Sequence, residues 1–225
     1  MARLFHAIRR RLPVRTLSSR AAYALWANMY PPYAHNHLMQ IEQNALMSLL
    51  PPLNDLQILD LACGSGRYAL AAAQMGARRV AGLDNSIEML QHGQRSLALH
   101  EPIQAELEAL PYNADSFDGV ICGLATGHLS PTRMRSAIHE IARVLRPGGW
   151  LLLSDFHPFL YLSGGRRTFI APGGRRFAVE HYPHLVADYF MALIDADLVL
   201  DALIEPLAAA RHIPAVLVFR ARKHE

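Results

Sequence analysis

The segment Ile58-Leu59-Asp60-Leu61-Ala62-Cys63-Gly64-Ser65-Gly66-Arg67-Tyr68-Ala69 is the most informative part of the sequence. An apolar run that enters a glycine turn and then a helix-like segment predicts a strand, a tight loop and a helix. Glycine at the end of a strand lets the backbone approach a ligand, and the following helix offers free N–H groups. Asp84 ends the next apolar run, where its carboxylate can accept both hydroxyls of an adenosine ribose. The sequence therefore predicts a nucleotide-type crevice.

Strand-like and helix-like runs alternate on both sides of this segment. We expect strands at 57–61, 79–83, 102–105, 117–122 and 150–155, and helices at 66–75, 86–98 and 132–145. Such alternation produces right-handed crossovers and a parallel sheet that is covered on both faces. A helix at 183–195 precedes two further strands, at 198–204 and 215–220, and the connection between these strands is too short for a helical crossover. The predicted fold is therefore a doubly wound α/β domain, with a mostly parallel seven-stranded sheet and an antiparallel last strand.

The composition is that of one folded domain. Of the 225 residues, 52% are hydrophobic and 18% charged, and no apolar run reaches the roughly 18 residues of a membrane span. The two cysteines, Cys63 and Cys122, have no metal-type spacing, and we expect them to be reduced thiols in a cytoplasmic protein. All but one of the 22 basic residues are arginine, and the single lysine is Lys223. A lysine so near the C-terminus excludes a P-loop and a pyridoxal Schiff base.

Three further regions are expected around the sheet. Residues 1–20 contain six arginines and no acid, which predicts a basic, mobile tail before a single domain at 21–225. Residues 21–50 read as a helical cover that is interrupted at Pro31-Pro32. Residues 158–190 read as a substrate-side insert, where Gly-Gly-Arg-Arg occurs at 164–167 and again at 173–176 around a predicted hairpin.

Asp60 decides between two ligands for the crevice. The glycine spacing and the downstream acid also fit a nicotinamide dinucleotide. A buried carboxylate beside a pyrophosphate would be repulsive, whereas beside a cation it is favourable. S-adenosylmethionine carries a sulfonium and an ammonium group and no phosphate, so Asp60 favours this cofactor. The alternative interpretations are that Asp60 caps a loop or helix, and that Asp84 is part of an ordinary N-cap before 86–98.

Five motifs follow one another in the order of a known family. They are Leu59-Asp60-Leu61-Ala62-Cys63-Gly64-Ser65-Gly66, Gly82-Leu83-Asp84-Asn85-Ser86 with Met89, Glu106-Leu107-Glu108-Ala109-Leu110-Pro111, Ser116-Phe117-Asp118-Gly119-Val120-Ile121, and Arg143-Val144-Leu145-Arg146-Pro147-Gly148-Gly149. Over roughly residues 30–157 the sequence resembles the class I S-adenosylmethionine-dependent methyltransferases. The resemblance is to the small-molecule branch that includes ubiquinone/menaquinone biosynthesis C-methyltransferases.

The resemblance implies a set of cofactor-binding residues. The glycines pass under the methionyl part of the cofactor, the acid of the second motif takes the ribose, and the third motif contacts the adenine. Glu106 stands where the family usually has aspartate, which puts the adenine contact in doubt. The candidate residues are Asp60, Ala62, Cys63, Gly64, Gly66, Asp84, Asn85, Met89, Glu106, Leu107, Cys122 and Tyr33.

On the substrate side, histidines are the candidate bases. Methyl transfer from a cationic sulfur needs alignment and dehydration first, and a general base is optional. His128 follows the fourth strand and His157 the fifth, and a histidine with an ordinary pKa near 6.5 suits proton removal. His181, Tyr182 and His184 lie on the insert that should roof the pocket. Tyr30, Tyr33, His35 and His37 lie on the segment expected to close over the cofactor.

Other ligands and functions are weighed against methylation of a small molecule. The element Tyr30-Pro31-Pro32-Tyr33 lacks the Asp or Asn that amino-methylating DNA enzymes place before it, so DNA is rejected as substrate. His35-Asn36-His37 has no partner ligands at metal spacing, and no metal site is predicted. One alternative is a non-catalytic S-adenosylmethionine-binding sensor or assembly protein, and another is a nicotinamide-dependent oxidoreductase. The sequence indicates a small-molecule acceptor and no integral membrane association, but leaves open its identity, the atom methylated and the oligomeric state.

Overall fold

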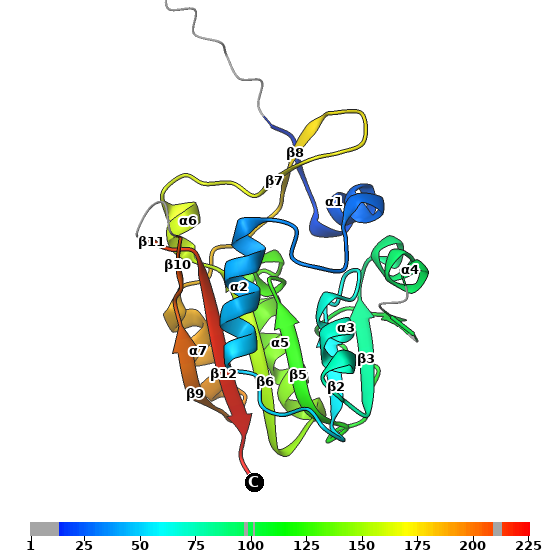
Figure 1. Ribbon diagram of the computed structural model, residues 1–225. Helices are drawn as coiled ribbons and strands as arrows, with labels where there is room; N and C mark the ends of the chain where they lie inside the picture. Colours follow the sequence, from blue (N-terminus) through cyan, green and yellow to red (C-terminus); the bar gives the residue numbers. More distant parts are fainter. Residues whose placement is uncertain (1–13, 97–98, 101, 209–212) are drawn as a thin grey trace, which may run out of the picture.

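A seven-stranded sheet forms the centre of the molecule in the computed structural model, which describes residues 14–96, 99–100, 102–208 and 213–225 (Figure 1). The strands lie in the order β4-β3-β2-β5-β6-β12-β9. Their bounds are β2 Gln57–Leu61, β3 Arg79–Asp84, β4 Ile103–Gln104, β5 Phe117–Gly123, β6 Leu145–Phe156, β9 Leu198–Ile204 and β12 Val216–Lys223.

The pairing confirms the predicted fold class. β2, β3, β4, β5 and β6 run parallel to one another, and β12 lies between β6 and β9 and is antiparallel to both. The last strand in the chain, β12, is therefore the second strand from one edge of the sheet, and β9 forms that edge. Because all the parallel strands end at the same side of the sheet, the loops after β2, β3 and β5 meet there.

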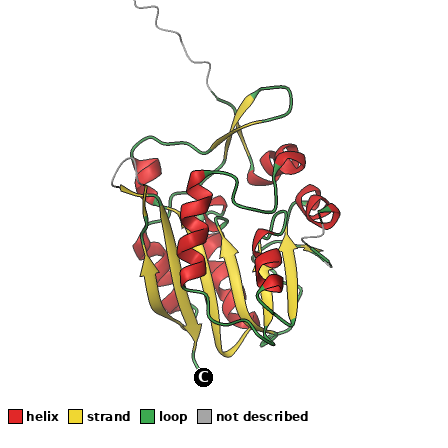
Figure 2. Ribbon diagram, viewed as in Figure 1, coloured by secondary structure: helices red, strands yellow, loops and turns green. Residues whose placement is uncertain are grey.

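Helices cover both faces of the sheet (Figure 2). One face packs against α2 (His37–Ser48), α3 (Arg67–Gln74) and α4 (Ile87–Arg95), and the other against α5 (Pro131–Val144) and α7 (Val186–Asp195). Successive side chains of a strand point to opposite faces, so Ile58 joins the cluster under α2 and α3 while Leu59 joins the cluster under α5 and α7. The predicted helices and strands are present, with ends that differ from the predicted ones by a few residues.

The N-terminal segment is more ordered than the sequence predicts. Residues 1–13 of the expected tail lie outside the described residues, but β1 (Thr16–Leu17) pairs in parallel with β8 (Arg176–Val179). The helix α1 (Ser19–Trp26) follows and continues as the short helix η1 (Ala27–Met29). Ordered structure therefore begins before residue 21, because the insert supplies a strand that the sequence of the tail does not reveal.

The predicted hairpin in the insert is present. The strand β7 (Thr168–Ile170) pairs antiparallel with β8, and the short helix α6 (Pro158–Leu162) precedes them. Phe169 and Phe177 from the hairpin pack with Ala22 and Trp26 of α1 in a small apolar cluster that is separate from the clusters under the sheet. We call α1, η1 and the β7–β8 hairpin the cover. The short strands β10 (Leu207–Ala208) and β11 (Ile213–Pro214) form a separate pair.

None of the helices within the described ranges combines the length and the apolar character that crossing a bilayer requires.

Candidate functional site

The glycine loop after β2 is held in its shape by positive φ angles and by a buried acid. Gly64 has φ 55° and Gly66, at the N-cap of α3, has φ 92°. These left-handed conformations favour glycine, because a Cβ atom would be strained there. Asp60 is only 2% exposed, and its Oδ2 accepts a hydrogen bond of 2.7 Å from the backbone N–H of Ala69 in the first turn of α3.

Asp60 therefore caps the helix, as one of the two interpretations of this residue expects. Its burial raises the pKa of the carboxyl group from an ordinary value of 3.8 to about 7, although the hydrogen bond from Ala69 and the charge of Arg67 act in the opposite direction. The residue also lines a cavity, so capping leaves it in contact with any ligand held there. A cationic ligand would favour the ionised form of this acid.

Asp84 ties the ends of two adjacent strands together. One carboxylate oxygen accepts a hydrogen bond of 2.8 Å from the N–H of Gly64, and the other accepts one of 2.8 Å from the N–H of Ser86. Burial raises the pKa of Asp84, and the backbone N–H groups lower it in part. Each oxygen keeps a second lone pair, and the side chain lines the cavity beside the glycine loop.

The cavity is formed where the loops after β2, β3 and β5 meet the cover, and it encloses about 870 Å³ when the part open to solvent is included. Nine of the predicted cofactor and catalytic residues line it: Asp60, Ala62, Cys63, Gly64, Asp84, Asn85, Met89, Leu107 and His128. Residues from across the chain, including Tyr23, Tyr30, Arg67, Leu124 and Arg167, complete the wall.

The remaining predicted residues are not in the cavity wall. Cys122 is fully buried in the core under α5 and α7, and Gly66 lies just beyond the wall at the start of α3. The side chain of Tyr33 is 62% exposed, and Tyr30 from the same segment lines the cavity in its place. Periodicity does not show which of two neighbouring tyrosines of an irregular segment points inward.

Glu106 lies outside the cavity wall and contacts protein groups at its rim. Its Oε2 lies 3.0 Å from Arg133 Nη2 and accepts a hydrogen bond of 3.3 Å from Asn85 Nδ2. The side chain is about half exposed, whereas the next residue, Leu107, is buried and reaches the cavity. Glu106 thus fixes the rim near Asn85.

His128 lines the cavity but has a strongly shifted pKa. Arg167 Nη1 donates to its Nε2 over 2.8 Å, so Nε2 is unprotonated and Nδ1 carries the proton that is donated to the carbonyl oxygen of Glu180 over 2.8 Å. Burial and the charge of Arg167 lower the pKa of His128 to about 3. The expectation of an ordinary pKa is wrong, because the sequence does not show that an arginine of the insert faces this ring.

His157 lies away from the cavity wall. It caps α6, where its Nδ1 accepts a hydrogen bond of 3.2 Å from the N–H of Phe159, and its Nε2 lies 3.0 Å from Glu205 Oε1. The structure therefore does not bring the two candidate bases together. On the insert, the ring of His181 stacks on Tyr161 at 3.8 Å, and His184 Nε2 donates a hydrogen bond of 3.0 Å to the carbonyl oxygen of Leu129.

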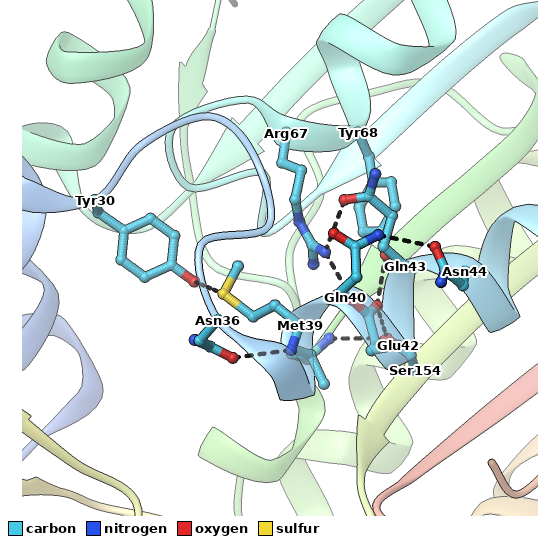
Figure 3. Close-up of polar contacts among 11 residues, drawn as sticks. Tyr30, Asn36, Met39, Gln40, Glu42, Gln43, Asn44, Arg67, Tyr68 and Ser154 are labelled. Atoms are coloured by element: carbon cyan, nitrogen blue, oxygen red, sulfur yellow. Dashed lines mark hydrogen bonds and ion pairs between the residues drawn. The ribbon is translucent and has the colours of Figure 1, made fainter. Parts of the chain in front are cut away.

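A buried polar cluster that the sequence did not indicate fixes α2 to the sheet (Figure 3). Glu42 of α2 is fully buried, and its Oε1 accepts hydrogen bonds of 2.6 Å from the Tyr68 hydroxyl and 2.5 Å from the Ser154 hydroxyl. Arg67 Nη1 lies 2.8 Å from Glu42 Oε2 as an ion pair without a well-directed hydrogen bond. This ion pair positions Arg67 at the cavity wall. The signal in the sequence that could have indicated this cluster is a glutamate, Glu42, inside an amphipathic helix.

Comparisons with known proteins agree with this geometry. The family model of the methyltransferase domain matches residues 58–149. A malonyl-[acyl-carrier protein] O-methyltransferase of Salmonella typhimurium is 35% identical over 129 residues, which are 57% of this chain and 49% of the relative. A ubiquinone/menaquinone biosynthesis C-methyltransferase of Blochmanniella floridana is 36% identical over 112 residues, 46% of this chain and 43% of the relative. The chain thus spans about half the length of the curated relatives it matches.

A solved structure extends the match to most of the chain. The S-adenosylmethionine-dependent methyltransferase from Mesorhizobium loti is 25% identical, with a TM-score of 0.67 over 81% of this chain and 98% of that one. Residues 58–149 match the methyltransferase domain, and over most of its length the chain is similar to class I S-adenosylmethionine-dependent methyltransferases. Within this class its relatives include the ubiquinone/menaquinone C-methyltransferases, which confirms the resemblance seen in the sequence.

Proposed function

We propose that this protein transfers a methyl group from S-adenosylmethionine to a small-molecule acceptor. One observation carries the proposal: one cavity is lined on one side by the glycine loop with Asp60 and Asp84, and on the other by Tyr23 of the cover and by Tyr30, which follows it. A group-transfer enzyme needs two ligands side by side in a space from which water is excluded. The cavity has one wall for each of the two ligands.

The residues of the first wall fit the cofactor. A Cβ atom added to Gly64 would lie 3.0 Å from the terminal methyl of Met89, so the loop leaves room that any larger residue would fill. Asp84 would hold the ribose, Met89 and Leu107 would pack against the adenine, and Asp60 would face the positive charge. An acid in this place disfavours a phosphate-bearing ligand.

S-adenosylmethionine supplies, when bound, a methyl group already activated by a positively charged sulfur. The chain therefore has to align the acceptor and remove water, and good alignment contributes about 7–11 kcal/mol to lowering a barrier of this kind. Tyr23 and Tyr30 close the cavity against solvent. With a pKa of about 3 and its Nε2 lone pair already accepting from Arg167, His128 holds the acceptor wall in place and does not remove a proton at neutral pH.

Two alternatives are compared with this proposal. A nicotinamide-dependent oxidoreductase is disfavoured by the position of Asp60 and by β12, which runs antiparallel between β6 and β9, where dinucleotide-binding sheets continue in parallel. A non-catalytic S-adenosylmethionine-binding protein would have the same first wall. Only an assay of methyl transfer distinguishes that alternative from an enzyme.

Calorimetry of the full chain tests the first step. We expect S-adenosylhomocysteine to bind and NADH not to bind, and we expect Asp84→Asn to weaken the binding at least tenfold. Asp115→Asn is the matched control, since Asp115 pairs with Lys223 far from the cavity. Saturation by NADH without any heat from S-adenosylhomocysteine would overturn the proposal. Tight cofactor binding without methylation of any acceptor in a broad panel would favour the non-catalytic alternative.

A further inference from the structure

The side chain of Arg167 is the least explained feature of the cavity. It precedes β7 on the insert and lines the cavity together with His128 and Leu124. Its Nη1 donates to His128 Nε2 over 2.8 Å and approaches the carbonyl oxygen of Leu124 at 3.5 Å. Its Cζ lies over two aromatic rings, 4.5 Å from the ring centre of Phe156 and 5.6 Å from that of Tyr23.

The positive charge of Arg167 is not neutralised within the part of the chain that the structure describes. None of the ion pairs found there includes it. Asp155 is the acid that raises the pKa of Arg167. Its oxygens, however, already accept hydrogen bonds from the Tyr189 hydroxyl and the N–H of Phe156. Arg167 is partly buried. Aromatic faces compensate a cation removed from water only in part, and such a charge is normally paired. Arg167 therefore has capacity for an anion.

The free donors of Arg167 have the geometry that suits one kind of anion. Within the described residues its recorded hydrogen bonds all use Nη1, which leaves Nε and Nη2 without a protein acceptor. These two nitrogens form the parallel fork that matches the two oxygens of a carboxylate. A phosphate site usually adds further cations or a helix N-terminus, and one arginine edge is the simpler match for a carboxylate.

Arg167 lies on the acceptor side of the cavity. In the sheet, β3 and β5 flank β2 on opposite sides, so Asp84 at the end of β3 and Leu124 just after β5 lie on either side of the glycine loop. Arg167 contacts the residues after β5, away from the acid proposed to hold the ribose. An anion bound to Arg167 would share the cavity with the cofactor.

We propose that the free edge of Arg167 binds a carboxylate of the methyl acceptor, so that the acceptor belongs to the class of small carboxylic acids. This inference rests on the proposed function, since it assigns one wall to the cofactor and the other to the acceptor. His128 acts as a positioning residue, because its Nε2 holds Nη1 and so orients the free edge. The cofactor also carries a carboxylate, and binding of that group by Arg167 is the competing outcome.

Binding titrations on the full chain saturated with S-adenosylhomocysteine test the inference without any turnover. The probes are matched pairs, benzoate with benzamide and hexanoate with hexanamide, and phenyl phosphate as a third anion. In the unaltered protein we expect at least one acid to bind at least tenfold more tightly than its amide and than phenyl phosphate. Arg167→Gln is expected to abolish this preference and to change the affinity for S-adenosylhomocysteine less than twofold.

Two further variants serve as controls. Arg166→Gln alters the exposed neighbouring arginine and is expected to bind every probe as the unaltered protein does. Arg167→Lys keeps the charge and loses the fork, so it should bind the acid with intermediate affinity, and it remains informative if Arg167→Gln does not fold.

Several results would overturn the inference. They are an acid that binds no better than its amide, an acid preference that survives Arg167→Gln, tighter binding of phenyl phosphate, or a tenfold loss of S-adenosylhomocysteine affinity in Arg167→Gln. The same titrations without S-adenosylhomocysteine separate this inference from the proposed function. If the unaltered protein gives no heat with S-adenosylhomocysteine but keeps the acid preference through Arg167, the proposed function fails and the carboxylate site stands.

Discussion

The two walls of the cavity are built in different ways. In the wall after β2 and β3, backbone turns are fixed by short hydrogen bonds to carboxylates, such as the 2.7 Å bond from Ala69 N–H to Asp60 and the 2.8 Å bond from Gly64 N–H to Asp84. On the other side, Tyr23 of the cover and Phe156 of β6 lie beside Arg167, and the apolar cluster of the cover is small and separate from the main core. We therefore expect the first wall to be rigid, as suits the cofactor, and the cover to open more easily, as suits the entry and exit of an acceptor.

The largest expected effects compare the cores of these two regions. Phe219 is 1% exposed in the main core, and Phe169 is 4% exposed in the cluster of the cover, where it stacks on Trp26 at 5.0 Å. Phe219→Ala should lower the free energy of unfolding by about 3–5 kcal/mol, as usual for a buried phenylalanine. Phe169→Ala should lower it by less than half as much, because a small cluster can open on its own.

Urea denaturation and native-state hydrogen exchange measure the two changes. Phe169→Ala is expected to remove protection from the amides of α1, β7 and β8 and to leave the protection of the central strands unchanged. Equal losses of stability in the two variants, with protection lost everywhere, would mean that the cover and the sheet unfold as one unit. The contrast between the walls would then be wrong.

The same contrast explains what the sequence could predict. The strand, the glycine turn and the acid of the first wall lie within short windows, so that periodicity and residue type are enough to place Asp60, Gly64 and Asp84. In the cover the decisive contacts join distant residues, such as Arg167 with His128. No local pattern shows that they meet. The histidine expected to be a base has its Nε2 lone pair occupied by an arginine from the insert, and its pKa is lowered.

The core likewise limits what local patterns reveal. Glu42 sits in an amphipathic helix, and its partners Tyr68 and Ser154 are 26 and 112 residues away, so its burial depends on the packed fold. Cys122 sits on the strand beside the glycine loop, but its side chain faces the opposite helices, since strand side chains alternate. The register of β5 against β2 decides which residues of β5 reach the cavity, and this register cannot be deduced from the sequence.

Substitutions of one glycine in each wall compare the two walls further, with a smaller expected effect on stability than the phenylalanine substitutions. Gly64 has φ 55° and Gly173, in the hairpin of the cover, has φ 87°, so alanine is strained at both. Each substitution should lower the free energy of unfolding by about 1–2 kcal/mol. A Cβ at position 173 meets nothing within 4 Å, whereas one at position 64 approaches Met89 at 3.0 Å and occupies the cavity.

Only Gly64→Ala should therefore weaken the binding of S-adenosylhomocysteine, by tenfold or more, while Gly173→Ala should bind it normally. Thermal melts and calorimetry on both variants give the two quantities. Normal binding by Gly64→Ala would show that the loop does not contact the ligand.

The smallest expected effect is a pair of opposite pH dependences, one from each wall. Burial raises the pKa of Asp60 to about 7 from 3.8, so the folded state binds more protons than the unfolded state in that window, and the contribution of Asp60 to stability falls as the pH rises. The pKa of His128 is lowered to about 3 from 6.5, so the unfolded state binds more protons and the contribution of His128 falls as the pH drops. Between pH 4 and 6.5 the two largely cancel, with about 1.4 kcal/mol per pH unit as the upper limit for each.

Single variants separate the contributions of Asp60 and His128 to stability, which largely cancel in the unaltered protein. The difference in unfolding free energy between the unaltered protein and His128→Gln should grow as the pH rises from 4.5 to 6.5, because the variant lacks the part that rises with pH. The same difference for Asp60→Asn should shrink over that range. His37→Gln, at an exposed position, controls for the substitution itself. Urea denaturation at pH 4.5, 5.5 and 6.5 supplies the curves, and differences that run parallel in both variants would mean that neither group is held in the protonation state that its surroundings impose.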